Sequence, residues 1–89
     1  MKYHITITDN ETGETRVDQD TCCIIVACDN GPKTRAGAFT DCNSIDLAST
    51  VAGALGIAYH LLKQLPRSLR RKTKKLAREA AREEARKNA

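Results

Sequence analysis

The sequence predicts an α+β domain in which a small antiparallel sheet of three to four strands is packed by one long helix and followed by a basic C-terminal helix. Three observations predict this class. Apolar and polar residues alternate near the N-terminus, a run rich in β-branched residues occupies 21–28, and apolar residues recur at helical spacing over 44–65. Within 89 residues these patterns fit the element order β-β-β-β-α-α.

The first two strands are expected to form a hairpin. Tyr3, Ile5 and Ile7 alternate with polar residues, and this period of two buries one face of a strand. Residues 9–13 supply turn chemistry, because their closing glycine readily adopts a positive φ. A short return strand over 14–17 follows, and the polar residues after it are expected to end the strand.

The third strand is expected to be central. Residues 21–28 are apolar on both faces, which is typical of a strand covered above and below. A turn containing Pro32 follows, and 33–40 reads as a weaker fourth strand. The long helix supplies one cover for the sheet. The second cover would be the basic helix, or a second copy of the chain in a two-fold homodimer.

The long helix begins where Asn43 or Ser44 can cap it. Its apolar residues cover about half the circumference, a width suited to packing across a sheet. Two glycines on the opposite side each cost about 1 kcal/mol relative to alanine, so we expect a second backbone to pack closely there. Pro66 ends or kinks this helix. The small or polar side consists of Ser49, Gly53, Gly56, His60 and Gln64.

Charge divides the chain into a core domain, residues 1–66, and a basic C-terminal helix, residues 67–89. The C-terminal segment contains ten basic and three acidic residues and carries +7, whereas 1–66 contains five basic and eight acidic residues and carries −3. The helix is expected from Ser68 to about Lys87, with a thin apolar stripe that includes Leu69 and Leu76. A stripe this thin predicts weak docking, or packing that is completed on a partner.

The sequence offers little for catalysis or for binding a cofactor. It has no glycine-rich phosphate loop and no helical metal-ligand pair. The spacing of His4 and His60 from the cysteines does not indicate a Cys–His nucleophile pair. We therefore expect a protein that is not an enzyme, with no catalytic residue, no cofactor and no metal. The cysteines lack zinc-site spacing and read as small buried hydrophobes, with a metal or redox role as the alternative. They are Cys22, Cys23, Cys28 and Cys42.

Part of the chain resembles small proteins of bacterial phages and integrated mobile elements. The resemblance covers about the first sixty residues. It is carried by Thr21-Cys22-Cys23-Ile24-Ile25, Asp41-Cys42-Asn43 and Asp46-Leu47-Ala48, together with the N-terminal hairpin pattern. It implies an accessory role exerted by binding, such as repression, modulation of a phage or host enzyme, or antagonism of a host defence complex of the anti-CRISPR kind. It assigns no functional residue.

The basic helix gives the leading functional hypothesis, a binding module for an acidic partner, either nucleic acid or a nucleic-acid-handling protein. The alternative is a protein–protein inhibitor or accessory protein that acts through its sheet or long-helix surface, the basic helix then serving as a solvated face. We expect a cytoplasmic protein, because no signal peptide opens the chain, and no membrane partner, because the long helix reads as amphipathic. The contact residues would be Arg70, Arg71, Lys74, Lys75, Arg78 and Arg82.

Overall fold

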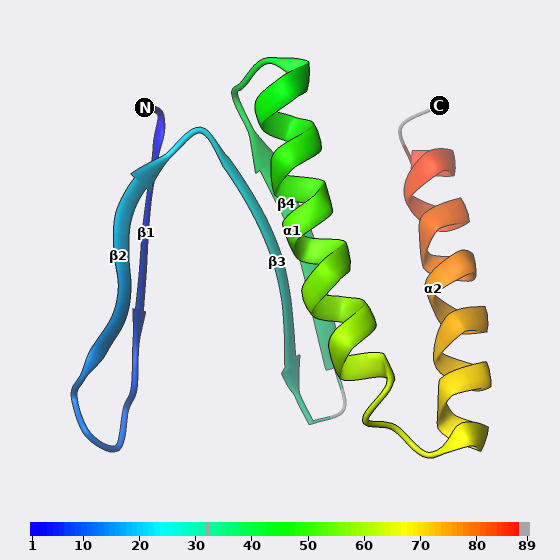
Figure 1. Ribbon diagram of the computed structural model, residues 1–89. Coiled ribbons are helices and arrows are strands. Elements are labelled where there is room, and N and C mark those ends of the chain that lie inside the picture. The colour runs from blue at the N-terminus through cyan, green and yellow to red at the C-terminus, as the bar shows by residue number, and fades with distance from the viewer. Residues whose placement is uncertain (32, 88–89) are drawn as a thin grey trace. The chain divides into compact units, whose positions relative to one another are not determined.

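A computed structural model describes residues 1–31 and 33–87. The predicted α+β class is confirmed. The chain forms two compact units, and the boundary between them lies between residues 54 and 55, inside the long helix. In chain order the elements are β1 (Tyr3–Thr8), β2 (Thr15–Thr21), β3 (Cys23–Asn30), β4 (Lys33–Thr40), α1 (Ser44–Leu62) and α2 (Arg67–Lys87) (Figure 1).

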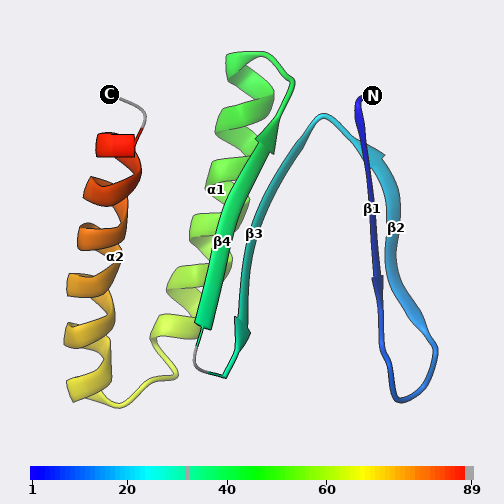
Figure 2. The ribbon, with the colours of Figure 1, turned by 180° about the vertical axis from the view of Figure 1, so that it is seen from behind.

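The four strands do not form the single sheet expected from the sequence. In the described residues β1 pairs with β2 and β3 pairs with β4, which gives two separate two-stranded antiparallel sheets. Only Cys22 lies between β2 and β3, and a tight reversal needs about two loop residues, so the chain bends there instead of pairing the two strands. Figures 1 and 2 show the two hairpins as separate ribbons on either side of this bend.

The first hairpin is longer than the sequence pattern predicted. The polar residues 18–20, expected to end the second strand, belong to β2 and pair with β1 in antiparallel register. The carboxylate of Asp9 accepts hydrogen bonds from the backbone N–H groups of Glu11 and Thr12, at 2.8 and 3.2 Å, and fixes the turn. Gly13 closes the turn at a φ of 75°, as predicted.

The second hairpin runs with continuous register from Cys23 opposite Thr40 to the end of β3. Strand β4 has the bounds predicted for the fourth strand, residues 33–40. Gly31 reverses the chain at a φ of 70°, a backbone conformation that glycine adopts without steric cost. The expected role of Pro32 in this turn lies outside the described residues.

Side chains of the two hairpins pack together at the corner where the hairpins join. The rings of Tyr3 and Phe39 meet edge to face, with 5.8 Å between their centroids. Cys23, which begins β3 beside this corner, is 7% exposed and is the one buried apolar residue in the described part of the chain. The core is therefore a small cluster at the corner and does not extend as a layer under a sheet.

Helix α1 begins as predicted but buries less than predicted. The side chain of Asn43 caps it, because the Asn43 Oδ1 accepts a hydrogen bond from the Asp46 N–H at 2.8 Å. No residue of α1 is buried, and even Leu47 and Val51 are 39% and 37% exposed. A ribbon of two strands about 5 Å apart is too narrow to cover half the circumference of a helix.

Candidate functional site

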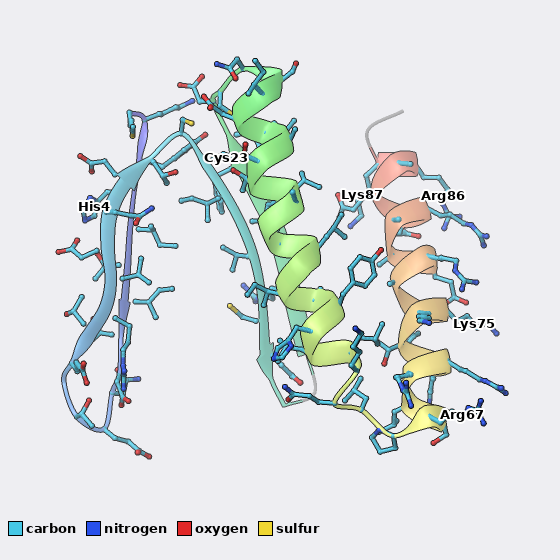
Figure 3. The ribbon with its side chains drawn as sticks, in the orientation of Figure 1. His4, Cys23, Arg67, Lys75, Arg86 and Lys87 are labelled. Carbon is cyan, nitrogen blue, oxygen red and sulfur yellow. The ribbon has the colours of Figure 1, made fainter. Side chains whose placement is uncertain are left out.

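Helix α2 places the predicted contact residues on one face. It is continuous over 21 residues, so the six basic residues between Arg70 and Arg82 lie within an arc of about 140° and span about 18 Å along the axis. Figure 3 shows Lys75 and Arg86 projecting from one side of α2 and Lys87 from the other. Six of the ten basic residues of the C-terminal segment therefore lie on one face of α2.

Among the described residues, the acidic residues of α2 form ion pairs only in its C-terminal turn. The Arg86 guanidinium pairs with the Glu83 carboxylate at 2.6 Å, and the Lys87 ammonium approaches the Glu84 carboxylate at 3.8 Å. Within residues 1–31 and 33–87, none of the six predicted contact residues takes part in an ion pair. In the part of the chain that the structure describes, no carboxylate lies within ion-pair distance of these six side chains.

A groove between α1 and α2, within the C-terminal unit, borders one edge of the basic face. Distance from this groove separates the six basic residues into two sets. The groove has a volume of about 510 Å³, and both Lys74 and Arg78 line it. The Nε of Arg70 is buried without a hydrogen-bond partner among the described atoms. The walls of the groove are formed by Leu55, Ala58, Tyr59 and Leu62 from α1 and by Thr73, Lys74, Ala77 and Arg78 from α2.

We call Arg70, Lys74 and Arg78 the groove set, because they lie on or next to the side of α2 that borders the groove. We call Arg71, Lys75 and Arg82 the outer set, because helical spacing places them further round the helix, away from the groove. The outer set is therefore the part of the basic face most open to a large polyanion.

The thin apolar stripe predicted for α2 does not provide its packing. Leu69 and Leu76 remain about half exposed, and neither lines the groove. From α2, the apolar residue that lines the groove is Ala77, beside polar and basic neighbours. Helix α2 is thus held by few apolar contacts, in agreement with the weak docking expected from its sequence.

No protein-family model, curated protein or solved structure matches this chain. The resemblance of its first sixty residues to phage and mobile-element proteins gains no support from these comparisons.

A histidine between two carboxylates is a feature that the sequence reading missed. The His4 Nδ1 lies 2.6 Å from the Asp20 Oδ1, and the His4 Nε2 lies 2.6 Å from the Asp18 Oδ1. Hydrogen bonds to Asp20 and then Asp18 raise the pKa of His4 above 6.5, and the same contact lowers the pKa of Asp20 below 3.8. The signal was available in the register, because His4 faces Asp20 once β2 is extended.

The shifted pKa values of His4 and Asp20 determine how the stability of the first hairpin changes with pH. Protonated His4 stabilises the hairpin fully below pH 6.5, and this stabilisation is lost as the pH rises through its raised folded pKa. Ionised Asp20 stabilises the hairpin above pH 3.8, and this contribution is lost as the pH falls through its lowered folded pKa. The cluster therefore favours the folded hairpin most in mildly acidic solution.

The cysteines follow the predicted buried pattern only in part. Cys23 is buried, Cys22 and Cys42 are half-buried, and Cys28 is exposed, which corrects the expectation that all four are interior. Cys28 lies near the turn of a narrow ribbon, opposite Arg35, where nothing broad enough covers it. Among the side chains of the described residues, no three from histidine, cysteine, aspartate and glutamate are arranged to hold a metal ion.

The exposed surface of α1 is the second feature open to a partner. By length and composition the helix is long and apolar enough to cross a membrane, although one such helix is weak evidence for a membrane span. A Cβ added at Gly53 or Gly56 would meet nothing within 4 Å. The second backbone expected against these glycines is therefore absent from the described part of the chain.

Proposed function

We propose that the protein is a non-enzymatic binding module whose α2 face engages the phosphate backbone of a nucleic acid. The observation that carries this proposal is the set of six basic residues on one arc with no ion pair in the part of the chain described. When such a face binds a polyanion, it releases condensed counterions, and this release favours binding. The effect depends on the density of positive charge and does not require recognition of bases.

The spacing of the charges supports a nucleic acid over an acidic protein surface. The face is about 18 Å long, and a duplex of that length presents about ten phosphates, more than the six cations require. Between the cations the arc carries only alanine, so a partner would gain little by apolar contact. The first turn of α2 has no acidic residue, so the helix dipole adds to the positive potential there.

The test measures binding of the full-length protein to short duplex DNA, duplex RNA and single strands across a salt series. Three to six phosphate contacts predict that the logarithm of the binding constant falls with the logarithm of salt concentration with a slope between about −2.7 and −5.4 on DNA. Fluorescence anisotropy of labelled oligonucleotides reports this slope directly. Changing all six arc residues to glutamine should remove binding while circular dichroism keeps its helical signal.

The outcome decides between two classes of partner. Binding with the expected slope, lost in the six-residue variant, supports a phosphate-binding face. If the unaltered protein binds none of the oligonucleotides at low salt, the nucleic-acid proposal is wrong, and an acidic protein surface becomes the target for α2. A slope near zero would also contradict it, because counterion release could not then drive the binding.

A second candidate, a protein–protein accessory role, is favoured by the open surface of α1. Ser49, Gly53 and Gly56 form a small-residue side against which another backbone could pack closely, and the partner would be a second copy or a different protein. Gly53→Ala and Gly56→Ala separate the readings. In a monomer each should raise helix stability by about 1 kcal/mol, whereas at an interface each should weaken association measured by sedimentation.

We also propose that the protein works in the cytoplasm and outside the bilayer. Helix α1 spans about 28 Å at its full length, and its first turns include Asp46 and Thr50, which are unfavourable in hydrocarbon. In flotation with uncharged phosphatidylcholine vesicles the protein should stay at the bottom of the gradient. Flotation with such vesicles would identify α1 as a membrane segment, because the basic face has no attraction for them.

A further inference from the structure

Three of the four cysteines gather at one end of the β3–β4 hairpin. Cys22 is the bend between β2 and β3, Cys23 begins β3, and Cys42 follows the end of β4. The Asp41 N–H donates a hydrogen bond to the Cys22 carbonyl oxygen at 2.8 Å, which extends the pairing of the two strands beyond their assigned ends. The chain therefore returns Cys42 to the place from which β3 starts.

The pairing of β3 with β4 brings Cys42 near the start of β3, where Cys23 lies. Cys23 stands opposite Thr40, the last residue of β4, and Cys42 follows two residues later in a bend of the chain. Burial, and then the neighbouring thiols of Cys23 and Cys22, raise the pKa of Cys42 to about 11. Figure 3 places the Cys23 side chain at this corner of the molecule.

We propose that Cys42 and Cys23 form a reversible disulfide by exchange with a low-molecular-weight disulfide such as oxidised glutathione. Cys42 is half-buried and Cys23 is 7% exposed, so the small disulfide meets Cys42 first. Cys28, exposed near the other end of β3, has no thiol opposite it and serves as an internal control. This inference is independent of the proposed role of α2.

The exchange balances in two steps. The Cys42 thiolate attacks one sulfur of oxidised glutathione and breaks its S–S bond. This step forms a mixed disulfide between Cys42 and one glutathione, and the other glutathione leaves as a thiolate. The Cys23 thiolate then attacks the Cys42 sulfur and expels the second glutathione thiolate. Two protein thiols lose two protons and two electrons, and one oxidised glutathione becomes two reduced glutathiones. The first step is slow near neutral pH, because the high pKa of Cys42 keeps its thiolate scarce.

The product would clamp the open end of the hairpin. The opposite end is already closed by the turn at Gly31, so the disulfide would hold β3 and β4 together at both ends. A closed loop of about 20 residues is long enough for the crosslink to raise the thermal midpoint by on the order of 10 °C. Reduction would release the end that leads directly into α1.

The test treats the full-length protein with oxidised glutathione, blocks the remaining thiols and maps the crosslink by mass spectrometry. We expect an intramolecular product that has lost two hydrogens, with the bridge between Cys23 and Cys42 and a raised thermal midpoint. Cys28→Ser and Cys22→Ser should retain this product, and Cys42→Ser should lose both the bridge and the thermal shift. Glutathione adducts without an internal bridge, or a bridge through Cys28 or Cys22, would overturn the assignment.

Discussion

The division of the α2 face into two sets predicts unequal effects when each set is neutralised. In one variant Arg71, Lys75 and Arg82, the outer set, become glutamine. In the other variant the groove set of Arg70, Lys74 and Arg78 is changed in the same way. Both variants lose the same net charge and keep a residue with good helix propensity, so a difference between them measures position on the helix.

The size of each effect follows from the number of phosphate contacts removed. Each contact on duplex DNA contributes about 0.9 to the salt slope, so loss of the outer set should reduce the slope by about 2.7 and weaken binding on the order of 500-fold at about 0.1 M salt. Lys74 and Arg78 face the groove beside α1, and Arg70 has a buried Nε. We therefore expect the groove set to reduce the slope by no more than about one unit.

The assay is anisotropy of labelled duplex DNA across a salt series, with circular dichroism to verify that α2 remains helical. A matched control changes Lys2, Lys63 and Lys72 to glutamine, because these residues lie outside the arc and their loss removes the same charge. The control should alter the slope by less than one unit. Equal losses in all three variants would refute the reasoning, because binding would then depend on net charge alone.

Three further predictions concern the fold. The thermal midpoint should fall as the pH rises from 6.5 through the raised folded pKa of His4, and His4→Asn should abolish this fall, whereas parallel pH profiles would contradict the assigned contact. Gly13→Ala should lower the free energy of unfolding in urea by about 1–2 kcal/mol, because its φ is positive, whereas Gly37→Ala, which meets open space without a positive φ, should not lower it. Asn43→Ala should cost about 1 kcal/mol by removing the cap of α1, and an unchanged urea midpoint would show that the Asp46 N–H is satisfied by other means.

Local patterns in the sequence predict the elements well where one short-range interaction dominates. Alternation identifies β1, the glycine at position 13 marks its turn, and Asn43 marks the start of α1. The Ala, Arg, Lys and Glu content of 68–87 predicts α2 to within one residue at its start. These features depend on neighbours within about four residues, so composition and spacing contain the information.

Features that depend on pairing between distant residues were mispredicted or missed. The polar residues 18–20 look like a strand end, yet they continue β2 because cross-strand partners in β1 fix them. Because these residues were expected to end the strand, the contact of His4 with Asp20 was missed. The sequence also predicted a single sheet where the structure has two hairpins. The meeting of Cys42 with Cys23 likewise depends on the register of a hairpin that spans almost twenty residues.

The sequence alone determined the chemistry of the candidate site, namely a dense set of basic residues confined to one helix and a body of opposite charge. Helical periodicity is local, so the arc of Arg70 to Arg82 follows from residue spacing. Only the tertiary structure decided which cations border the groove with α1, which thiols meet, and that the wide apolar arc of α1 stays uncovered. Those outcomes depend on where the chain turns back, and a single residue between β2 and β3 decides that they form separate ribbons.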